Sequence, residues 1–156
     1  MKTKLLVVGK TNDKNITKGI DDYVGRVKHY MPFDIEVIPE LKNTKSLTQS
    51  NQKEMEAEQI LKRLQPSDTV VLLDEHGKEY RSIEFARWIE KLQQTARSLV
   101  FIIGGPYGFA DSVYERSDAK LSLSKMTFSH QMIRLLFVEQ IYRACTIIKG
   151  EPYHHE

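Results

Sequence analysis

The stretch SLVFIIGGPYG, residues 98–108, joins an apolar run to a glycine-rich loop. Its first six residues carry no charge and show no alternation of apolar and polar side chains, which is typical of a strand that is covered on both faces. The run TVVLLD, residues 69–74, has the same character. Strands of this kind occur in parallel sheets with helices on each side. The two runs therefore predict an α/β fold with a mainly parallel sheet.

Helical and strand patterns alternate along the rest of the chain, as an α/β sandwich requires. Gly77 predicts a turn, and Ser82 predicts the N-cap of a helix. Residues 43–52 are polar without a period and predict a loop. Apolar residues recur at helical spacing, or alternate as in strands, in the following segments: strands at 5–8, 33–38 and 120–124, and helices at 16–27, 55–64, 83–92, about 110–116 and about 129–149. Together they predict a single domain over residues 1–156, with helices flanking the sheet.

The bulk properties restrict the class of protein. A chain of 156 residues is long enough to bury a real core without disulfides or metals. Cys145 is the only cysteine, so no internal disulfide can form, and this fits a reducing compartment. No stretch approaches the roughly 20 apolar residues of a membrane span, and the first apolar run is too short for a signal peptide. We therefore expect a cytoplasmic protein with no membrane association.

The net charge gives no strong argument for a nucleic-acid partner. The chain has 23 Lys and Arg against 21 Asp and Glu, a net charge of +2. Nucleic-acid-binding domains usually show a larger excess of positive charge or a basic stripe. A local basic patch remains compatible with this composition, particularly if two subunits combine their surfaces.

Three segments are expected to meet beyond the carboxyl ends of the strands, where parallel sheets bind ligands. They are the end of the 69–74 run, the glycine loop at 104–108, and residues 121–130. The loop lacks the Walker A and dinucleotide-binding patterns, and Pro106 removes a backbone N–H that a phosphate cradle would use. Two interpretations stay open: a glycine-rich turn that serves only the fold, or a flat cradle for a nucleoside.

His130 is expected in the first turn of the last helix, with Thr127 or Ser129 as the cap. The helix dipole disfavours the imidazolium there, so a neutral ring can act as a base or an acceptor. A purely structural role for this histidine is the alternative. Arg134 follows one turn later on the same face and, if buried, is expected to pair with a carboxylate or a phosphate. Arg143 lies four residues after Glu139, which favours an intrahelical ion pair, with an RNA phosphate as the rival partner.

The last helix is apolar around most of its circumference, which is unusual for a surface helix. We therefore expect a homodimer with twofold symmetry that shares this helix between subunits. The tail EPYHHE, residues 151–156, is expected to be disordered, as termini usually are. Its adjacent histidines do not predict a metal site, because neighbouring residues rarely converge on one ion.

Five motifs, in order, resemble the ribosomal large subunit methyltransferase H family of the SPOUT superfamily. They are LLVVGK (5–10), VVLLDEHGK (70–78), FIIGGPYG (101–108), LSLSKMTFSHQMIRLLFVEQIYRA (121–144) and PYH (152–154). The resemblance covers the whole chain. It implies a homodimer whose C-terminal part is threaded into a trefoil knot, which general rules of chain connection disfavour. It also implies methyl transfer from S-adenosylmethionine to N3 of a pseudouridine in 23S rRNA on the assembled ribosome.

Because N3–H of a uracil ring must be lost, we expect the catalytic candidates to be His130, Arg134, Tyr153 and His154, the last two from the same or the other subunit. No metal is expected. The residues implied for binding S-adenosylmethionine are Leu73, Asp74, Gly104, Gly105, Gly108, Leu123, Ser124, Lys125, Met126, Thr127 and Phe128. Two other classes remain as alternatives: a non-catalytic RNA- or ribosome-binding module on the same scaffold, and a nucleotide-binding enzyme that uses the glycine loop for phosphate.

Overall fold

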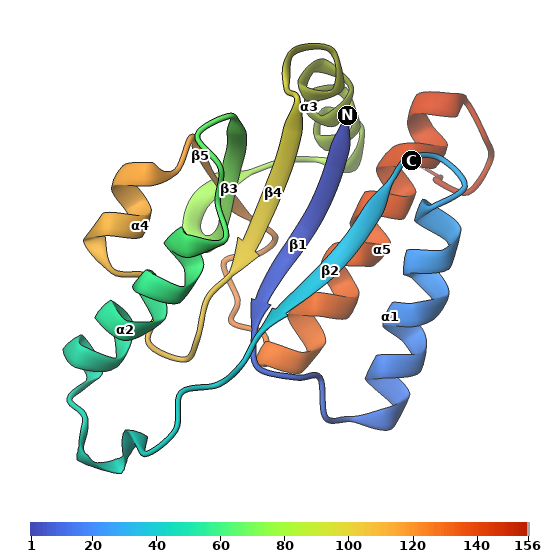
Figure 1. Cartoon of the computed structure of the whole chain (residues 1–156). Helices are drawn as coiled ribbons and strands as arrows, with labels where there is room; N and C mark the ends of the chain where they lie inside the picture. The colour runs from blue at the N-terminus through green and yellow to red at the C-terminus, as the bar shows by residue number, and fades with distance from the viewer. Residues whose placement is uncertain (156) are drawn as a thin grey trace.

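The computed structural model describes residues 1–155 and shows a parallel five-stranded sheet between two layers of helices (Figure 1). The strands lie in the order β2-β1-β4-β3-β5, and every neighbouring pair is parallel. This confirms the α/β prediction. The strands are β1 (Lys2–Val8), β2 (Phe33–Ile38), β3 (Asp68–Glu79), β4 (Ser98–Ile103) and β5 (Ala119–Ser122).

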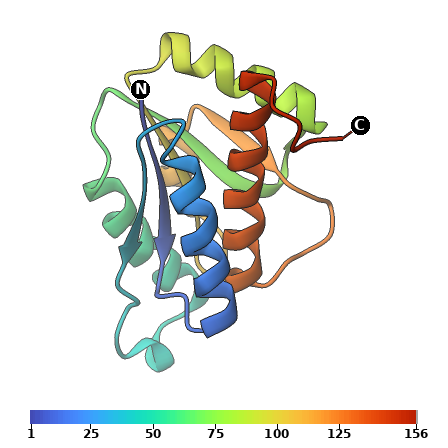
Figure 2. The same cartoon turned by 90° about the vertical axis from the view of Figure 1, so that its right-hand side faces the viewer.

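The helices divide between the two faces of the sheet. Helices α1, α3 and α5 cover one face, where α1 and α5 run side by side (Figure 2), and α2 and α4 cover the other. A short 3-10 turn, η1 (Thr44–Ser46), precedes α2. The helices are α1 (Lys14–Val27), α2 (Gln49–Lys62), α3 (Ser82–Thr95), α4 (Asp111–Arg116) and α5 (His130–Lys149).

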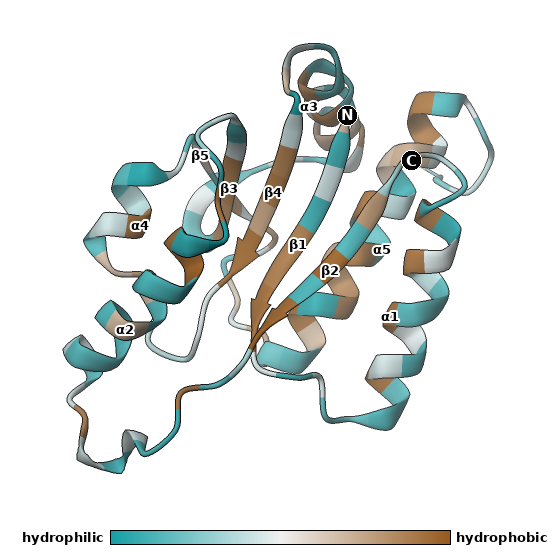
Figure 3. Cartoon of the chain, in the orientation of Figure 1, coloured by the Kyte–Doolittle hydropathy of each residue, from teal (hydrophilic) through white to brown (hydrophobic). Residues whose placement is uncertain are grey.

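Strand β4 explains why its sequence is apolar without alternation. Leu99, Phe101 and Ile103 point into the core beneath α1, α3 and α5, and the ring of Phe101 lies 4.7 Å from that of Phe137, centroid to centroid. Val100 and Ile102 point into the opposite core, beneath α2 and α4. Both faces of this central strand are therefore buried, and most of β4 has the brown colour of hydrophobic residues in Figure 3.

The ends of α5 are those that the sequence predicts. The Ser129 hydroxyl accepts a hydrogen bond from the Met132 N–H at 3.1 Å, which identifies Ser129 rather than Thr127 as the cap. Gly150 ends the helix in the left-handed conformation, with φ of +72°. Both devices satisfy backbone groups that a helix end leaves unpaired.

Two local predictions were wrong. Residues 43–52 were expected to form a loop, but the Thr48 hydroxyl accepts from the Asn51 N–H at 3.0 Å and α2 begins at Gln49. Ser82 was expected to be an N-cap, but it is the first residue of α3. The cap position is Arg81, whose N–H donates to Glu84 Oε1 at 2.8 Å. Thr48 lies four residues before the end of the expected loop, and Arg81 lies one residue before the expected cap.

Gly77 does not end its strand in a turn. Strand β3 pairs with β5 at Val71–Leu73 and again at Lys78–Glu79, and the residues between these two stretches bulge out of the ladder. A Cβ on Gly77 would lie 2.7 Å from the carbonyl carbon of Lys120. The glycine is therefore required by the close approach of two backbones. The trefoil knot stays a prediction, because strand order and register do not follow the threading of the loops.

Within residues 1–155, none of the helices combines the length and the apolar character that a membrane crossing requires. No group of three or more His, Cys, Asp or Glu side chains gathers in a metal-binding arrangement in this part of the chain.

Replacing Gly77 with alanine is expected to lower the free energy of unfolding by about 1–3 kcal/mol, because neither backbone can move aside cheaply. Gly25 in α1 is the matched control, since a Cβ there meets nothing within 4 Å. Gly25→Ala is expected to stabilise the protein by about 0.5–1 kcal/mol. Urea unfolding followed by circular dichroism measures both variants. Equal stability of the two would contradict the packing argument.

Candidate functional site

A cavity of about 440 Å³ opens where β3 and β4 end. We call it the strand-end cavity. Its walls come from the end of β3 and its bulge, the loop that follows β4, and the segment between β5 and α5. These are the three segments that the sequence places together. The parallel arrangement of the strands brings them to one edge of the sheet.

Most of the predicted binding residues line this cavity, with one exception. Lys125 lies in a neighbouring shallower hollow with Glu75 and His76; its side chain is 87% exposed, and its Nζ is 3.9 Å from Glu79 Oε1. The predicted residues that line the strand-end cavity are Leu73, Asp74, Gly104, Gly105, Gly108, Leu123, Ser124, Met126, Thr127 and Phe128. Tyr114 also contributes, which the sequence did not indicate, because its place depends on how α4 packs.

The glycines after β4 meet structural requirements of the fold. Gly108 has φ of +80°, and its N–H donates to the Gly105 carbonyl at 3.2 Å, which closes a tight turn. A Cβ on Gly105 would lie 2.4 Å from Glu56 Oε1, and one on Gly104 would lie 2.9 Å from the Phe109 ring. The turn interpretation therefore accounts for these residues. Because glycine has no side chain, Gly104 and Gly105 also leave backbone groups exposed along the cavity wall.

Asp74 places a negative charge in the cavity wall. It accepts a hydrogen bond from the Tyr114 hydroxyl and another, of 2.9 Å, from the His76 N–H. Burial alone would raise the pKa of Asp74, but these two hydrogen bonds outweigh it and hold the pKa below its usual value. The pKa of Tyr114 is instead raised to about 12, by burial and by the neighbouring carboxylate. An ionised carboxylate in this wall favours a cationic ligand.

His130 lies at the rim of the same cavity, in the first turn of α5. Although the side chain of His130 is exposed, its pKa is lowered. The larger cause is partial loss of solvent around the ring, and the smaller is the positive charge of Arg134. The imidazole is therefore neutral at pH 7, as its helix position predicts.

Arg134 fastens the start of α5 to the end of β1. Its Nη1 donates to the Gly9 carbonyl and to the Thr11 hydroxyl, both at 2.9 Å, and its Nη2 donates to the Val8 carbonyl at 2.8 Å. The side chain is 3% exposed. The sequence predicted a carboxylate or a phosphate as its partner; within the described residues, backbone carbonyl groups and a hydroxyl at the strand end bond its two terminal nitrogens.

The tail residues form a separate cluster farther along α5. Arg143 holds Glu139 by two contacts of 2.5 and 3.1 Å, which confirms the predicted ion pair. The Tyr153 hydroxyl donates to Glu139 at 3.1 Å, and His154 Nδ1 lies 3.0 Å from Arg143 Nη1. Tyr153 and His154 thus pack on the helix, where the sequence predicted a disordered tail.

The four catalytic candidates therefore form two groups within one chain. His130 and Arg134 are at the start of α5. Tyr153 is bonded to Glu139, roughly 13 Å along the helix axis from His130 at 1.5 Å per residue. Side chains at this separation cannot act on the same atom within a single subunit.

Comparison with known proteins identifies relatives over the whole chain. The model of the family described as "Predicted SPOUT methyltransferase" matches residues 1–154. A Bacteroides fragilis protein named "Ribosomal RNA large subunit methyltransferase H" is 66% identical over the full length of both chains. Proteins of the same name from Phocaeicola vulgatus and Flavobacterium psychrophilum are 64% and 50% identical, again over the full length of both chains.

The lowered pKa of His130 predicts a pH-dependent stability. The unfolded chain binds a proton at this residue more readily than the folded chain, so stability is complete above the ordinary pKa of 6.5 and declines as the pH falls below it. Replacing His130 with asparagine should remove this decline. As the pH falls from about 7 to about 5, the range in which histidine titrates, the Tm of the wild type should therefore decrease more than the Tm of the variant.

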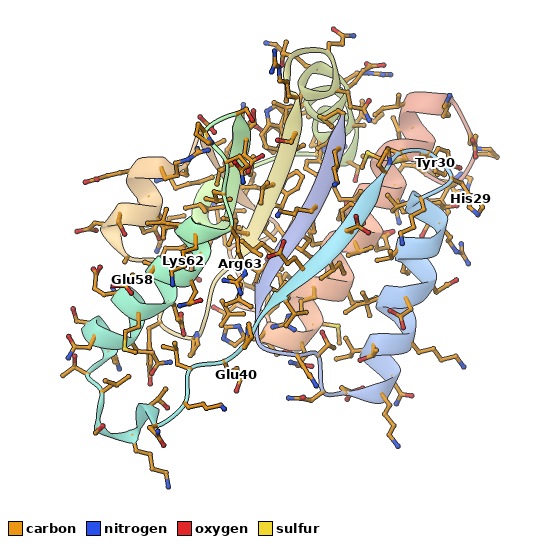
Figure 4. The ribbon with its side chains drawn as sticks, viewed as in Figure 1. His29, Tyr30, Glu40, Glu58, Lys62 and Arg63 are labelled. Atoms are coloured by element: carbon orange, nitrogen blue, oxygen red, sulfur yellow. The ribbon has the colours of Figure 1, made fainter. Side chains whose placement is uncertain are left out.

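The matched control is His29→Asn, which changes an exposed histidine at the opposite edge of the sheet (Figure 4). Its Tm should follow that of the wild type over the same pH range. A constant offset between His130→Asn and the wild type at every pH would contradict the inference.

Proposed function

The chain belongs to the SPOUT methyltransferase family, and from this we propose that it methylates large-subunit rRNA, with S-adenosylmethionine as the methyl donor and N3 of a pseudouridine as the acceptor. The relatives named for this rRNA activity cover its entire length. The observation that supports the donor assignment is the strand-end cavity, with the ionised carboxylate of Asp74 in its wall.

The residues of the strand-end cavity suit this donor. A volume of about 440 Å³ falls within the range of small-molecule sites. The backbone of Gly104 and Gly105 offers hydrogen-bonding groups to the edge of an adenine ring, and Leu73, Leu123 and Phe128 supply apolar contacts. Asp74 complements the positive sulfonium charge, which the demethylated product lacks.

When bound, S-adenosylmethionine supplies an activated methyl group: N3 of the base bonds to the methyl carbon, the carbon–sulfur bond breaks with its electron pair remaining on sulfur, and the N3 proton is lost. The chain has to align the acceptor and to receive this proton. Neutral His130 at the cavity rim is the residue that we assign to proton removal or to hydrogen bonding with the base.

The alternative functions are less well supported. A nucleotide-binding enzyme would place phosphates near the glycine loop, where the carboxylate of Asp74 would repel them. A non-catalytic RNA-binding module would have no need for a cavity with an ionised carboxylate in its wall. The chemistry of the wall therefore favours methyl transfer.

A homodimer would bring the two groups of candidates together, with Tyr153 and His154 of one subunit reaching the cavity of the other. Two of the exposed apolar side chains lie near the start of α5: Met126 is 76% exposed and Met132 is 40% exposed. A second hollow of about 280 Å³, between α3, β5 and α5, is lined by Phe85, Leu136 and other residues. A monomer mass in sedimentation equilibrium would rule this proposal out.

Asp74→Asn is expected to weaken S-adenosylmethionine about tenfold and to leave S-adenosylhomocysteine nearly unaffected, because only the first carries the sulfonium charge; tenfold corresponds to about 1.4 kcal/mol. Isothermal titration calorimetry with both ligands measures the ratio. Asp21→Asn, on the exposed face of α1, is the control and should change neither affinity. An equal loss for both ligands would show that Asp74 shapes the cavity without sensing charge.

His130→Ala is expected to reduce the methylation rate at least tenfold while the affinity for S-adenosylmethionine stays within about twofold, since general acid–base groups contribute 10²–10⁴-fold and the donor is held elsewhere. The assay follows transfer of a tritiated methyl group to large ribosomal subunits from a strain that lacks the enzyme. His29→Ala is the control. If the wild type binds the donor and transfers no methyl group to these subunits, the proposed function fails.

A further inference from the structure

A second cavity, of about 300 Å³, lies on the other side of His130, where β1 and β2 end. We call it the β1–β2 cavity. Gly105, Pro106 and His130 belong to the walls of both cavities. The remaining wall comes from the end of β1, the segment after β2 and the first half of α2. A ligand here would therefore be the immediate neighbour of a ligand in the strand-end cavity.

Arg134 offers this cavity a donor that the fold leaves unused. It lines the cavity, is 3% exposed, and its Nε has no hydrogen-bond partner among residues 1–155. Its two terminal nitrogens are bonded to the end of β1, so the guanidinium cannot turn to satisfy Nε elsewhere. Since an unpartnered buried donor costs about 1–3 kcal/mol, such groups are rare unless a ligand completes them.

Glu40 offers an acceptor. It lies just past the end of β2 (Figure 4), and a Cβ on Gly9 would be 2.5 Å from its Oε1, so its carboxylate rests against the backbone of the loop after β1. None of the described residues forms a hydrogen bond with the Glu40 carboxylate or an ion pair with it within 4 Å. Its negative charge acts on both Arg134 and Glu56 across the cavity.

Glu56 completes the polar wall. It is 6% exposed and, among residues 1–155, receives one hydrogen bond, from the Gln52 amide at 3.4 Å. Burial, and to a smaller extent the charge of Glu40, raise the pKa of Glu56, whereas the bond from Gln52 lowers it. A glutamate in these surroundings holds a proton more readily and can then donate to a carbonyl. The cavity thus presents donors and acceptors on facing walls.

We propose that the β1–β2 cavity binds the base to be methylated, as a uracil-type ring splayed out of the RNA, and that Glu40 accepts the additional ring N–H that distinguishes pseudouridine from uridine. This inference rests on the proposed function. A pseudouridine ring has N3–H between two carbonyl groups and N1–H next to one of them, which matches an acceptor at Glu40 and donors at Arg134 and Glu56. Enzymes that act on a paired or stacked base must expose it, and small polar cavities receive it.

The lysines around the cavity suit the neighbouring phosphates. Lys10 lies in its wall, and Lys42 and Lys45 lie in the segment after β2 that forms one side. All three are exposed, and none has a carboxylate within 4 Å among the described residues. A phosphate inside the cavity would face the carboxylate of Glu40, so the charges place the base within and the backbone at the rim.

Glu40→Gln tests the proposal. The substrates are large ribosomal subunits that carry pseudouridine at the target position and matched subunits that carry uridine there. For the wild type, kcat/KM should be higher with pseudouridine. In Glu40→Gln, kcat/KM with pseudouridine should fall at least tenfold and the ratio between the two substrates should approach one, because a neutral amide is a weaker acceptor than a carboxylate.

Three readouts separate this inference from its alternatives. The affinity of Glu40→Gln for S-adenosylmethionine should equal that of the wild type, and Glu58→Gln on the exposed face of α2 should behave as the wild type throughout (Figure 4). The Lys42→Ala, Lys45→Ala double variant should raise KM for both substrates without changing their ratio. An unchanged ratio in Glu40→Gln would overturn the role of Glu40 while the proposed function stands. A wild type that methylates neither substrate would remove both.

Discussion

The contact between Arg134 and the end of β1 holds the candidate site together. Three hydrogen bonds from one guanidinium fix the first turn of α5 to Val8, Gly9 and Thr11. This contact sets the position of His130, one turn earlier, between the two cavities. A buried cation is tolerated here because carbonyl oxygens at the strand end would otherwise lack partners. Arg134 thus both bonds the carbonyl groups at this edge of the sheet and orients the candidate site.

The sequence predicted the features that depend on local patterns. The uniform apolar character of β4 indicated a strand that is buried on both faces, and Ser129 and Gly150 marked the ends of α5. The meeting of three segments at one edge followed from the parallel sheet alone. Each of these depends on spacing along the chain, which a single sequence contains.

Features that depend on distant contacts were missed. The partner of Asp74 is Tyr114, which is brought near by the packing of α4 and not by any pattern around either residue. The tail was expected to be disordered because termini usually are, yet Tyr153 packs on the ring of Tyr142 with centroids 4.7 Å apart and bonds to Glu139. The partners of Arg134 were missed for the same reason, because no sequence pattern shows which backbone carbonyl groups an arginine bonds.

The distribution of charge matters more than its total in this chain. A net charge of +2 gave little reason to expect RNA, but a sum over the chain hides the local arrangement. Many carboxylates are used inside the protein: Asp74 is held by Tyr114, Glu139 by Arg143, and Glu36 by Lys4 and Arg63. The lysines next to the β1–β2 cavity have no such partners among the described residues. The exposed Lys10, Lys42 and Lys45 thus form a local positive group beside the β1–β2 cavity, although the composition is nearly neutral.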